Sequence, residues 1–191
     1  MSANSQTPSR RARLIEIVKA RSFQVGPEMK LASGRTSTFY FNMKPTMLNA
    51  EGARLIGELI CDQLDGVDAD LVGGLEMGAV PIAAATAAIA HTRGRNLSAF
   101  FVRKQAKEHG TRSLIEGLAR DETMAGKKIV IVEDVTTTGG SSIKAAEAIR
   151  AAGGDIVRVV TVVDRQEGAK EAFAAAGLDL SPLLTMSDFR S

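Results

Sequence analysis

Two almost uninterrupted apolar runs constrain the fold of this chain more than any other feature. Residues 128–132 read Lys-Ile-Val-Ile-Val, and residues 156–163 are again dominated by valine and isoleucine. A strand that faces solvent on one side alternates apolar and polar residues, so runs like these indicate strands buried on both faces. Such strands lie in the middle of a parallel sheet that helices cover on both sides. The chain is therefore predicted to be an α/β protein with a central, mostly parallel sheet.

Helical and extended patterns alternate along the rest of the chain, as expected of βαβ units. The first helix is predicted to be followed by a polar turn, and Pro45 is expected to push Lys44 away from helix. The polar, basic stretch from Arg103 to Glu116 predicts a long mobile loop. The helices are predicted over 9–20, from a cap at Asn49 to Leu64, over 80–90 and over 141–152, and further strands over 38–42, 70–73 and 97–102.

Length, charge and cysteine content limit the class of protein. The 191 residues suit one domain over 1–191, with an N-terminal helix and a small hood over about 1–45 and an α/β core over 46–191. A net charge of +2 is too small for a dedicated nucleic-acid binder. The longest apolar stretch, Ala79 to Ala90, falls short of the roughly 20 residues that a membrane-spanning helix needs. Cys61 is the only cysteine, which suits a reducing compartment, so a cytoplasmic protein with no nucleic-acid or membrane partner is expected.

The segment that follows the first apolar run is predicted to bind a phosphate and a ribose. Glu133 and Asp134 come at the carboxyl end of the strand, the edge where open α/β sheets bind ligands. The next residues, Thr137 to Ser141, offer hydroxyls and free N–H groups at the start of a helix, which attract a phosphate dianion. The two acids would repel this anion unless they faced hydrogen-bond donors, such as the vicinal diol of a ribose. A glycine turn with an incidental acid pair is the alternative.

The order of residues in this segment resembles a known signature. The chain contains neither Gly-x-x-x-x-Gly-Lys-Ser/Thr nor Gly-x-Gly-x-x-Gly. The segment resembles the signature with which type I phosphoribosyltransferases bind phosphoribosyl pyrophosphate (PRPP). That signature consists of an apolar strand, two acids, an apolar residue, and then Thr and Gly at the start of a helix. The resemblance implies PRPP binding by Glu133, Asp134, Val135, Thr136, Thr137, Thr138, Gly139, Gly140 and Ser141.

The basic stretch that begins at Arg103 follows a predicted strand, so its cations are expected on the same rim of the sheet. Positioned cations neutralise a departing pyrophosphate alongside a metal ion. The spacing Arg-Lys-x-x-Lys-x-His-Gly resembles the mobile catalytic loop of orotate phosphoribosyltransferases, which reaches into the neighbouring subunit's site. This implies a homodimer in which Arg103, Lys104, Lys107 and His109 bind the pyrophosphate of PRPP, and in which Lys107, His109 and Asp134 are catalytic. A charged surface loop without a role is the alternative.

Two further segments resemble the part of this family's site that holds the base. Arg165, in the sequence Asp-Arg-Gln-Glu, matches the arginine that holds orotate, and Thr137 is matched likewise. An ion pair of Arg165 with Asp164 or Glu167 is the alternative. Ser33 to Asn42 resembles the family's substrate hood, although its Phe-Tyr-Phe aromatics could equally belong to the core.

The chain departs from many relatives at two positions where they have lysine, Ala32 and Met77, and Lys30 and Lys44 are candidate substitutes for the missing cations. The resemblance implies transfer of ribose 5-phosphate from PRPP to orotate, giving orotidine 5′-monophosphate and pyrophosphate in pyrimidine biosynthesis. It also implies a Mg²⁺ cofactor bound mainly through PRPP. The alternatives are a phosphoribosyltransferase of the same fold for another base, and a PRPP-sensing regulator without catalysis.

Overall fold

The structure of the protein is a computed structural model that describes residues 8–30, 36–105 and 114–190, except the side chains of Met29 and Lys30. A five-stranded sheet forms its centre, and each neighbouring pair of strands is parallel. The predicted α/β class with a central parallel sheet is confirmed. The strand order is β4 (Ser98–Ala99), β3 (Leu71–Gly73), β7 (Lys128–Thr136), β8 (Asp155–Asp164) and β9 (Leu180–Thr185).

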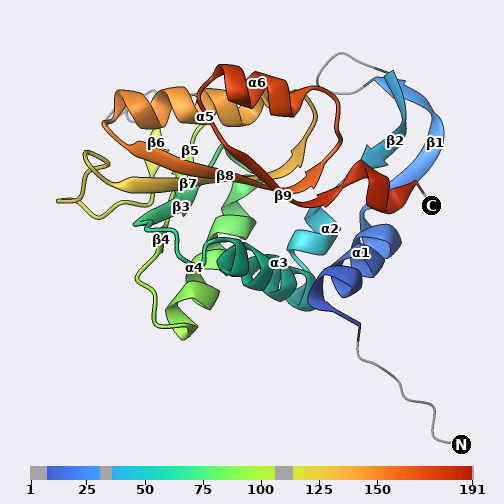
Figure 1. Ribbon diagram of the computed structural model, residues 1–191, viewed down its shortest axis with the longest axis horizontal. Helices are drawn as coiled ribbons and strands as arrows, with labels where there is room; N and C mark the ends of the chain where they lie inside the picture. The colour runs from blue at the N-terminus through green and yellow to red at the C-terminus, as the bar shows by residue number, and fades with distance from the viewer. Residues whose placement is uncertain (1–7, 31–35, 106–113, 191) are drawn as a thin grey trace, which may run out of the picture.

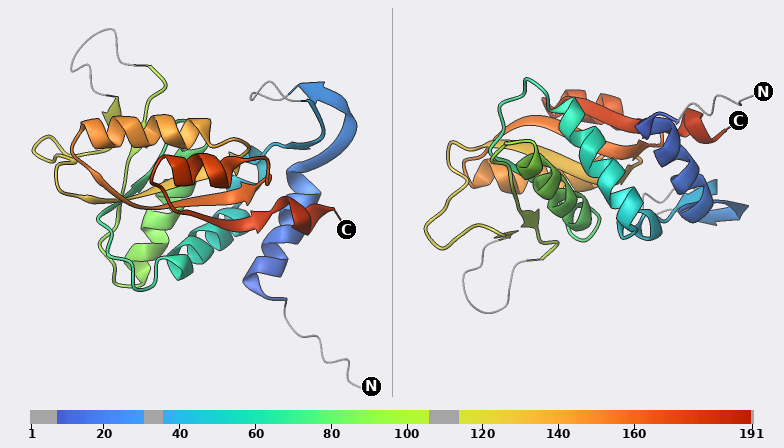
Figure 2. Two further views of the ribbon diagram at one scale, coloured as in Figure 1. Left: turned by 45° about the horizontal axis from the view of Figure 1, so that its top comes forward. Right: turned by 90° about the horizontal axis from the view of Figure 1, so that it is seen from below.

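Helices cover both faces of this sheet (Figures 1 and 2). The helices α3 (Ala50–Gln63) and α4 (Ala79–Thr92) lie on one face, and α5 (Gly140–Ala151) and α6 (Ala169–Ala175) lie on the other. The first helix, α1 (Arg10–Arg21), packs beside α3. Among the described residues, no helix combines the length and the apolar character that crossing a membrane requires.

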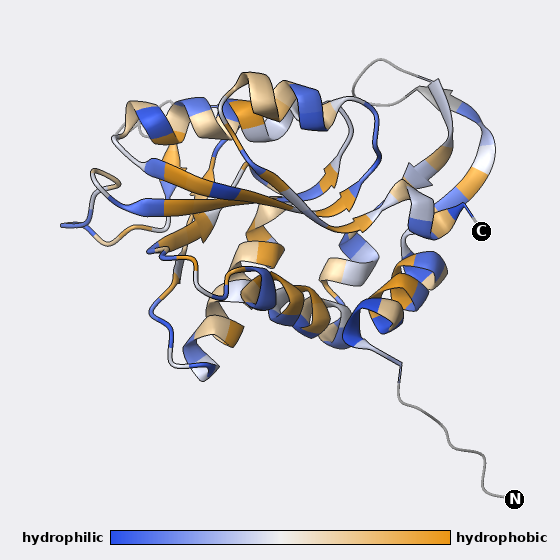
Figure 3. Cartoon of the chain, in the orientation of Figure 1, coloured by the Kyte–Doolittle hydropathy of each residue, from blue (hydrophilic) through white to orange (hydrophobic). Residues whose placement is uncertain are grey.

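The side chains of β7 alternate between two hydrophobic clusters, one on each face of the sheet. Ile129 and Ile131 belong to the cluster beneath α5 and α6, whereas Val130 and Val132 belong to the cluster formed with α3 and α4. Each of these four residues is at most 1% exposed. Successive strand residues point to opposite faces, so a central strand covered twice must be apolar throughout, as Figure 3 shows for the middle of the sheet.

The segment after α1 is a strand, so the prediction of a polar turn there is wrong. β1 (Phe23–Lys30) pairs antiparallel with β2 (Thr36–Phe41) in a separate hairpin, which carries the described part of the hood. Phe41 packs against the ring of Phe23, with their centroids 5.0 Å apart, and against Phe189 near the carboxyl end of the chain. Tyr40 points to the other face and is 39% exposed. The aromatic run is thus split by the strand period, with Phe41 in the core.

The structure corrects three other local predictions. Lys44 begins the short helix α2 (Lys44–Met47), because Pro45 occupies the first turn, where a backbone N–H has no helical partner to lose. The strand predicted over 97–102 divides into β4 and β5 (Phe101–Val102). Strand β5 pairs antiparallel with β6 (Ile115–Glu116), so the end of the predicted loop is extended and paired. Residues 106–113 of that loop lie outside the described residues.

Candidate active site

The acid pair lies at the carboxyl end of β7, where the strand turns into α5. Glu133 is only 8% exposed, and its Oε2 accepts a hydrogen bond of 2.8 Å from Ser142 Oγ. Burial, followed by the charge of the neighbouring Asp134, raises the pKa of Glu133 to about 8. The Glu133 carboxyl therefore holds a proton near neutral pH and is able to donate a hydrogen bond as well as to accept one.

The second acid, Asp134, is held above the start of α4. Its Oδ1 accepts a hydrogen bond of 2.9 Å from the backbone N–H of Val135. A Cβ atom added to Gly78, the residue before α4, would lie 2.6 Å from the same oxygen. Only glycine at position 78 leaves room for the carboxylate in this position, and Gly78 was not among the predicted site residues. The signal for it was the glycine-rich connection after β3, on the same rim of the sheet.

The turn between β7 and α5 encloses a first cavity of about 290 Å³, termed the phosphate cavity. Gly139 takes a φ of 84° there, a conformation that residues with a side chain rarely adopt. Thr136 contributes its backbone only, because its buried hydroxyl donates to Thr161 Oγ1 at 2.9 Å. The described residues that line the cavity are Glu133, Val135, Thr136, Thr137, Thr138, Gly139, Gly140, Ser141 and Lys144.

A second cavity of about 500 Å³, termed the diphosphate cavity, shares Glu133 and Ser141 with the first. Lys44 from α2 and Lys104 from the end of β5 both line it, together with Glu133 and Asp134. Met77 is 62% exposed on its rim and adds no charge. The place of Lys44 agrees with the hypothesis that it substitutes for a missing cation, whereas the side chain of Lys30 lies outside the described residues.

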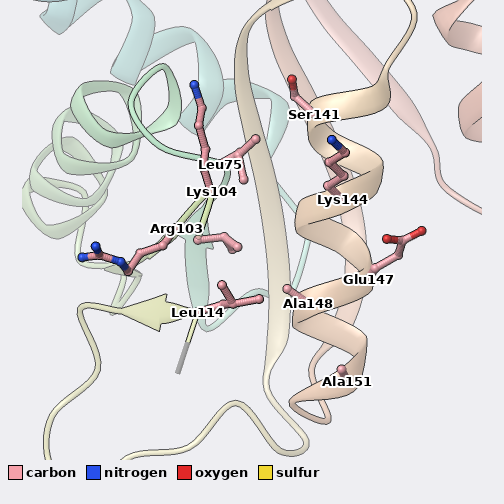
Figure 4. Close-up of a pocket in the computed structure, with 10 residues that line it drawn as sticks. Leu75, Arg103, Lys104, Leu114, Ser141, Lys144, Glu147, Ala148 and Ala151 are labelled. Atoms are coloured by element: carbon pink, nitrogen blue, oxygen red, sulfur yellow. The ribbon is translucent and has the colours of Figure 1, made fainter. Parts of the chain in front are cut away.

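A third cavity of about 610 Å³ separates β5 from α5 (Figure 4). Arg103 and Lys104 line it from one side, and Lys144 lines it from the other. In Figure 4 the guanidinium of Arg103 points away from α5, and its Nη1 lies 3.8 Å from Glu116. Ser141 lines all three cavities, so they meet at the first turn of α5. Lys107 and His109, which were predicted to complete this region, lie outside the described residues.

Arg165 follows β8 and connects the core to the hood. It is 3% exposed, and its guanidinium donates to the backbone oxygen of Phe39 at 3.0 Å and to Ser37 Oγ at 2.8 Å. The guanidinium also pairs with Glu167 at 2.8 Å, so the ion pair considered as an alternative is present. The contact with Ser37 was not foreseen, because nothing in the sequence indicates which residues of the hood meet the strand end.

Known proteins resemble the chain over most of its length. Residues 46–176 match the model of the phosphoribosyl transferase domain. Orotate phosphoribosyltransferase from Rhodopseudomonas palustris (strain BisB18) is 59% identical over 179 residues, which cover 94% of this chain and 95% of that protein. A crystal structure of Mycobacterium tuberculosis H37Rv orotate phosphoribosyltransferase in complex with PRPP is 38% identical, has a TM-score of 0.76, and is matched over 94% of this chain and 98% of that one. The phosphoribosyltransferase from Corynebacterium diphtheriae has a TM-score of 0.81 at 39% identity, over 95% of this chain and 98% of that one.

The parallel sheet, the acid pair and the phosphate turn at its rim define the class of protein as a phosphoribosyltransferase. Within this class, relatives that are 59% identical over 94% of the chain are named orotate phosphoribosyltransferase. The chain belongs to the orotate phosphoribosyltransferase family.

Proposed function

We propose that this enzyme transfers the ribose 5-phosphate of PRPP to orotate, which yields orotidine 5′-monophosphate and pyrophosphate in the pyrimidine pathway. One observation carries the proposal: the phosphate cavity and the lysine-bearing diphosphate cavity share Glu133 and Ser141, and Asp134 lines the second of them. PRPP has a phosphate at one end, a diphosphate at the other and a diol in the middle. The order of groups along the site therefore suits this substrate.

Each part of PRPP has a proposed set of partners. The 5′-phosphate accepts hydrogen bonds from the N–H groups and hydroxyls over 137–141, at the positive end of α5. The ribose hydroxyls meet Glu133 and Asp134. Arg103 and Lys104, with Lys107 and His109 from the following residues, bind the diphosphate. Val135 and Thr136 contribute backbone groups next to the phosphate, since the hydroxyl of Thr136 is occupied by Thr161.

The chemical step requires stabilisation of charge rather than a covalent intermediate with the enzyme. Departure of pyrophosphate leaves positive character at the ribose C1 and ring oxygen, and the orotate nitrogen attacks from the opposite face. Lys107 and His109 are proposed to neutralise the charge that develops on the leaving group. Asp134, with Glu133 beside it, is proposed to hold the ribose while its C1 moves from one partner to the other.

A Mg²⁺ ion is proposed as the cofactor. No three His, Cys, Asp or Glu side chains come together as a ligand set among residues 8–30, 36–105 and 114–190. The carboxylates of Glu76 and Asp134 do line the diphosphate cavity and suit a hard cation that takes most of its ligands from diphosphate, ribose and water oxygens. When bound, the ion would neutralise the diphosphate.

Arg165 and Thr137 are proposed to bind the orotate. A guanidinium has five N–H donors, and the three hydrogen bonds of Arg165 use one each, so two remain for the carboxylate of the base. Arg165 is also fixed against the ring of Phe41, 6.0 Å from its centroid. A rigid, buried fork of this kind selects a planar carboxylate, because its direction is set before the ligand arrives.

We propose that the enzyme is a homodimer in the cytoplasm whose basic loop serves the partner's site. Mixing two inactive variants tests the shared loop. Lys107→Ala and Asp134→Asn subunits are unfolded together and refolded, so that mixed dimers form. In a mixed dimer, one site combines the acid pair of the Lys107→Ala subunit with the intact loop of the Asp134→Asn subunit. About a quarter of the wild-type activity is expected for random association of two subunits. Activity that stays at the level of the separate variants would contradict the shared loop.

One assay tests the reaction itself. The enzyme is mixed with PRPP, Mg²⁺ and, in separate tubes, orotate, uracil, adenine or hypoxanthine, and consumption of the base is followed. Consumption of orotate alone is expected. Consumption of another base would favour the related transferases, and PRPP binding without consumption of any base would favour the regulator.

A further inference from the structure

Lys144 lines the phosphate cavity but lies outside the motifs that resemble the family's site. It lies on α5, three residues after Ser141, so the two side chains share one face of the helix. Figure 4, which shows the third cavity, places the two residues one turn apart on α5. Lys144 is the one cation among the described residues that line the phosphate cavity, and Glu133 is the one acid.

Lys144 is exposed at the mouth of this cavity, and its ammonium group has no partner among the residues that the structure describes. Glu147 lies one turn further along α5 and forms no described ion pair with it. The first turn of α5 contains no acidic residue. A cation close to the amino end of a helix is repelled by the partial positive charge there. An anion bound in the phosphate cavity would offset this repulsion, because the start of α5 and Lys144 line the same cavity.

We propose that Lys144 is a further PRPP-binding residue, which neutralises the 5′-phosphate in the cavity between β7 and α5. The inference rests on the proposed function, and it assigns to the phosphate end of the substrate a cation that the turn itself lacks. The N–H groups over 137–141 supply direction, whereas Lys144 supplies a full positive charge. The enzyme thereby distinguishes a ribose phosphate from an unphosphorylated ribose.

Two other roles for Lys144 predict different measurements. A solvated lysine on the surface of α5 would have no effect on any ligand. A lysine that reaches across the third cavity, which it shares with Lys104, would bind the diphosphate instead. Ribose 5-phosphate and inorganic pyrophosphate separate these roles, because each carries only one of the two charged ends of PRPP.

The test compares the wild type with Lys144→Gln, Lys144→Arg and a matched control, Lys127→Gln, which changes an exposed lysine just before β7 at the other end of the strand. Titration calorimetry gives the Kd of ribose 5-phosphate and of pyrophosphate for each protein. For Lys144→Gln we expect the Kd of ribose 5-phosphate to rise about tenfold, as for loss of one charge-assisted hydrogen bond. The Kd of pyrophosphate should stay within about twofold. Lys144→Arg should restore most of the affinity, and Lys127→Gln should match the wild type.

An unchanged Kd of ribose 5-phosphate in Lys144→Gln, or a rise for pyrophosphate instead, would overturn the inference. Because ribose 5-phosphate binding requires neither orotate nor turnover, this result is separate from failure of the proposed function, which would show as wild-type protein that consumes no orotate. In steady-state assays the same variant should raise the KM for PRPP by a similar factor and leave kcat nearly unchanged. A loss that came from misfolding would instead appear in all variants of position 144, including Lys144→Arg.

Discussion

Ser142 Oγ donates a hydrogen bond of 2.8 Å to the buried carboxyl of Glu133, which joins the first turn of α5 to the end of β7. The pKa of the Glu133 carboxyl is raised, because burial and the neighbouring charge of Asp134 both disfavour its charged form.

The raised pKa of Glu133 predicts a pH-dependent stability of the ligand-free protein. The carboxyl keeps its proton up to about pH 8 in the folded state, against an ordinary pKa of 4.5. Between these values the folded protein binds more protons than the unfolded protein, so its stability decreases as the pH rises. Melting temperatures measured from pH 5 to pH 9 should fall less steeply for Glu133→Gln than for the wild type. Parallel curves for the two proteins would contradict the assignment.

Gly78→Ala should impair catalysis by moving Asp134. The new Cβ would lie 2.6 Å from Asp134 Oδ1, so the carboxylate must shift. Misplacement of a substrate-positioning group by about 1 Å can cost on the order of a hundredfold in rate, and a loss of this size in kcat/KM is expected. The control is Gly66→Asn, at a turn position with a φ of 76° and no neighbour within 4 Å, which should keep full activity. Equal activities of the two variants would refute the steric argument.

Arg165→Ala should weaken both the fold and orotate binding. Removal of the guanidinium breaks the ion pair with Glu167 and removes the anchor of the hood, at a cost of about 3 kcal/mol in the free energy of unfolding. The KM for orotate should rise strongly. Glu167→Gln is the matched comparison, because it removes the ion pair but keeps the contacts of Arg165 with Ser37 and Phe39. If Glu167→Gln raised the KM for orotate as much as Arg165→Ala, the pair rather than the arginine would be responsible.

Lys44→Ala should raise the KM for PRPP about fivefold, because one of the two described lysines in the diphosphate cavity is removed. The measured quantity is the initial rate at saturating orotate and varied PRPP concentration. Lys127→Ala, which removes an exposed lysine at the opposite end of β7, serves as the control. An unchanged affinity for PRPP and orotate in Lys44→Ala would end the hypothesis that Lys44 substitutes for a missing cation.

Lys107→Ala should reduce kcat by at least about a hundredfold, as for loss of a group that stabilises charge on the leaving pyrophosphate. The Kd of ribose 5-phosphate should be unchanged, since that ligand has no diphosphate. Full turnover in Lys107→Ala would remove the residue from the catalytic set.

The sequence by itself determined the layers of the fold and one end of the site. Runs such as 128–132 predict strands buried on both faces, and the acids and glycines that follow such a strand fall at the ligand-binding edge of the sheet. These features are local in the chain, so spacing and residue type were enough to find them. Asn49 caps α3 as its side chain predicts, for the same reason.

Only the tertiary structure decided which distant residues meet. The approach of Gly78 to Asp134, the contact of Arg165 with Ser37 and the place of Lys44 opposite Lys104 each join segments far apart in the chain. The pairing of β1 with β2 and the division of 97–102 into β4 and β5 likewise depend on partner strands that local patterns do not specify. The residue type determines what a side chain can bind, but the packing of the sheet and helices determines which charges come together and which are buried. That packing raises the pKa of Glu133 and places Lys144 beside the phosphate turn.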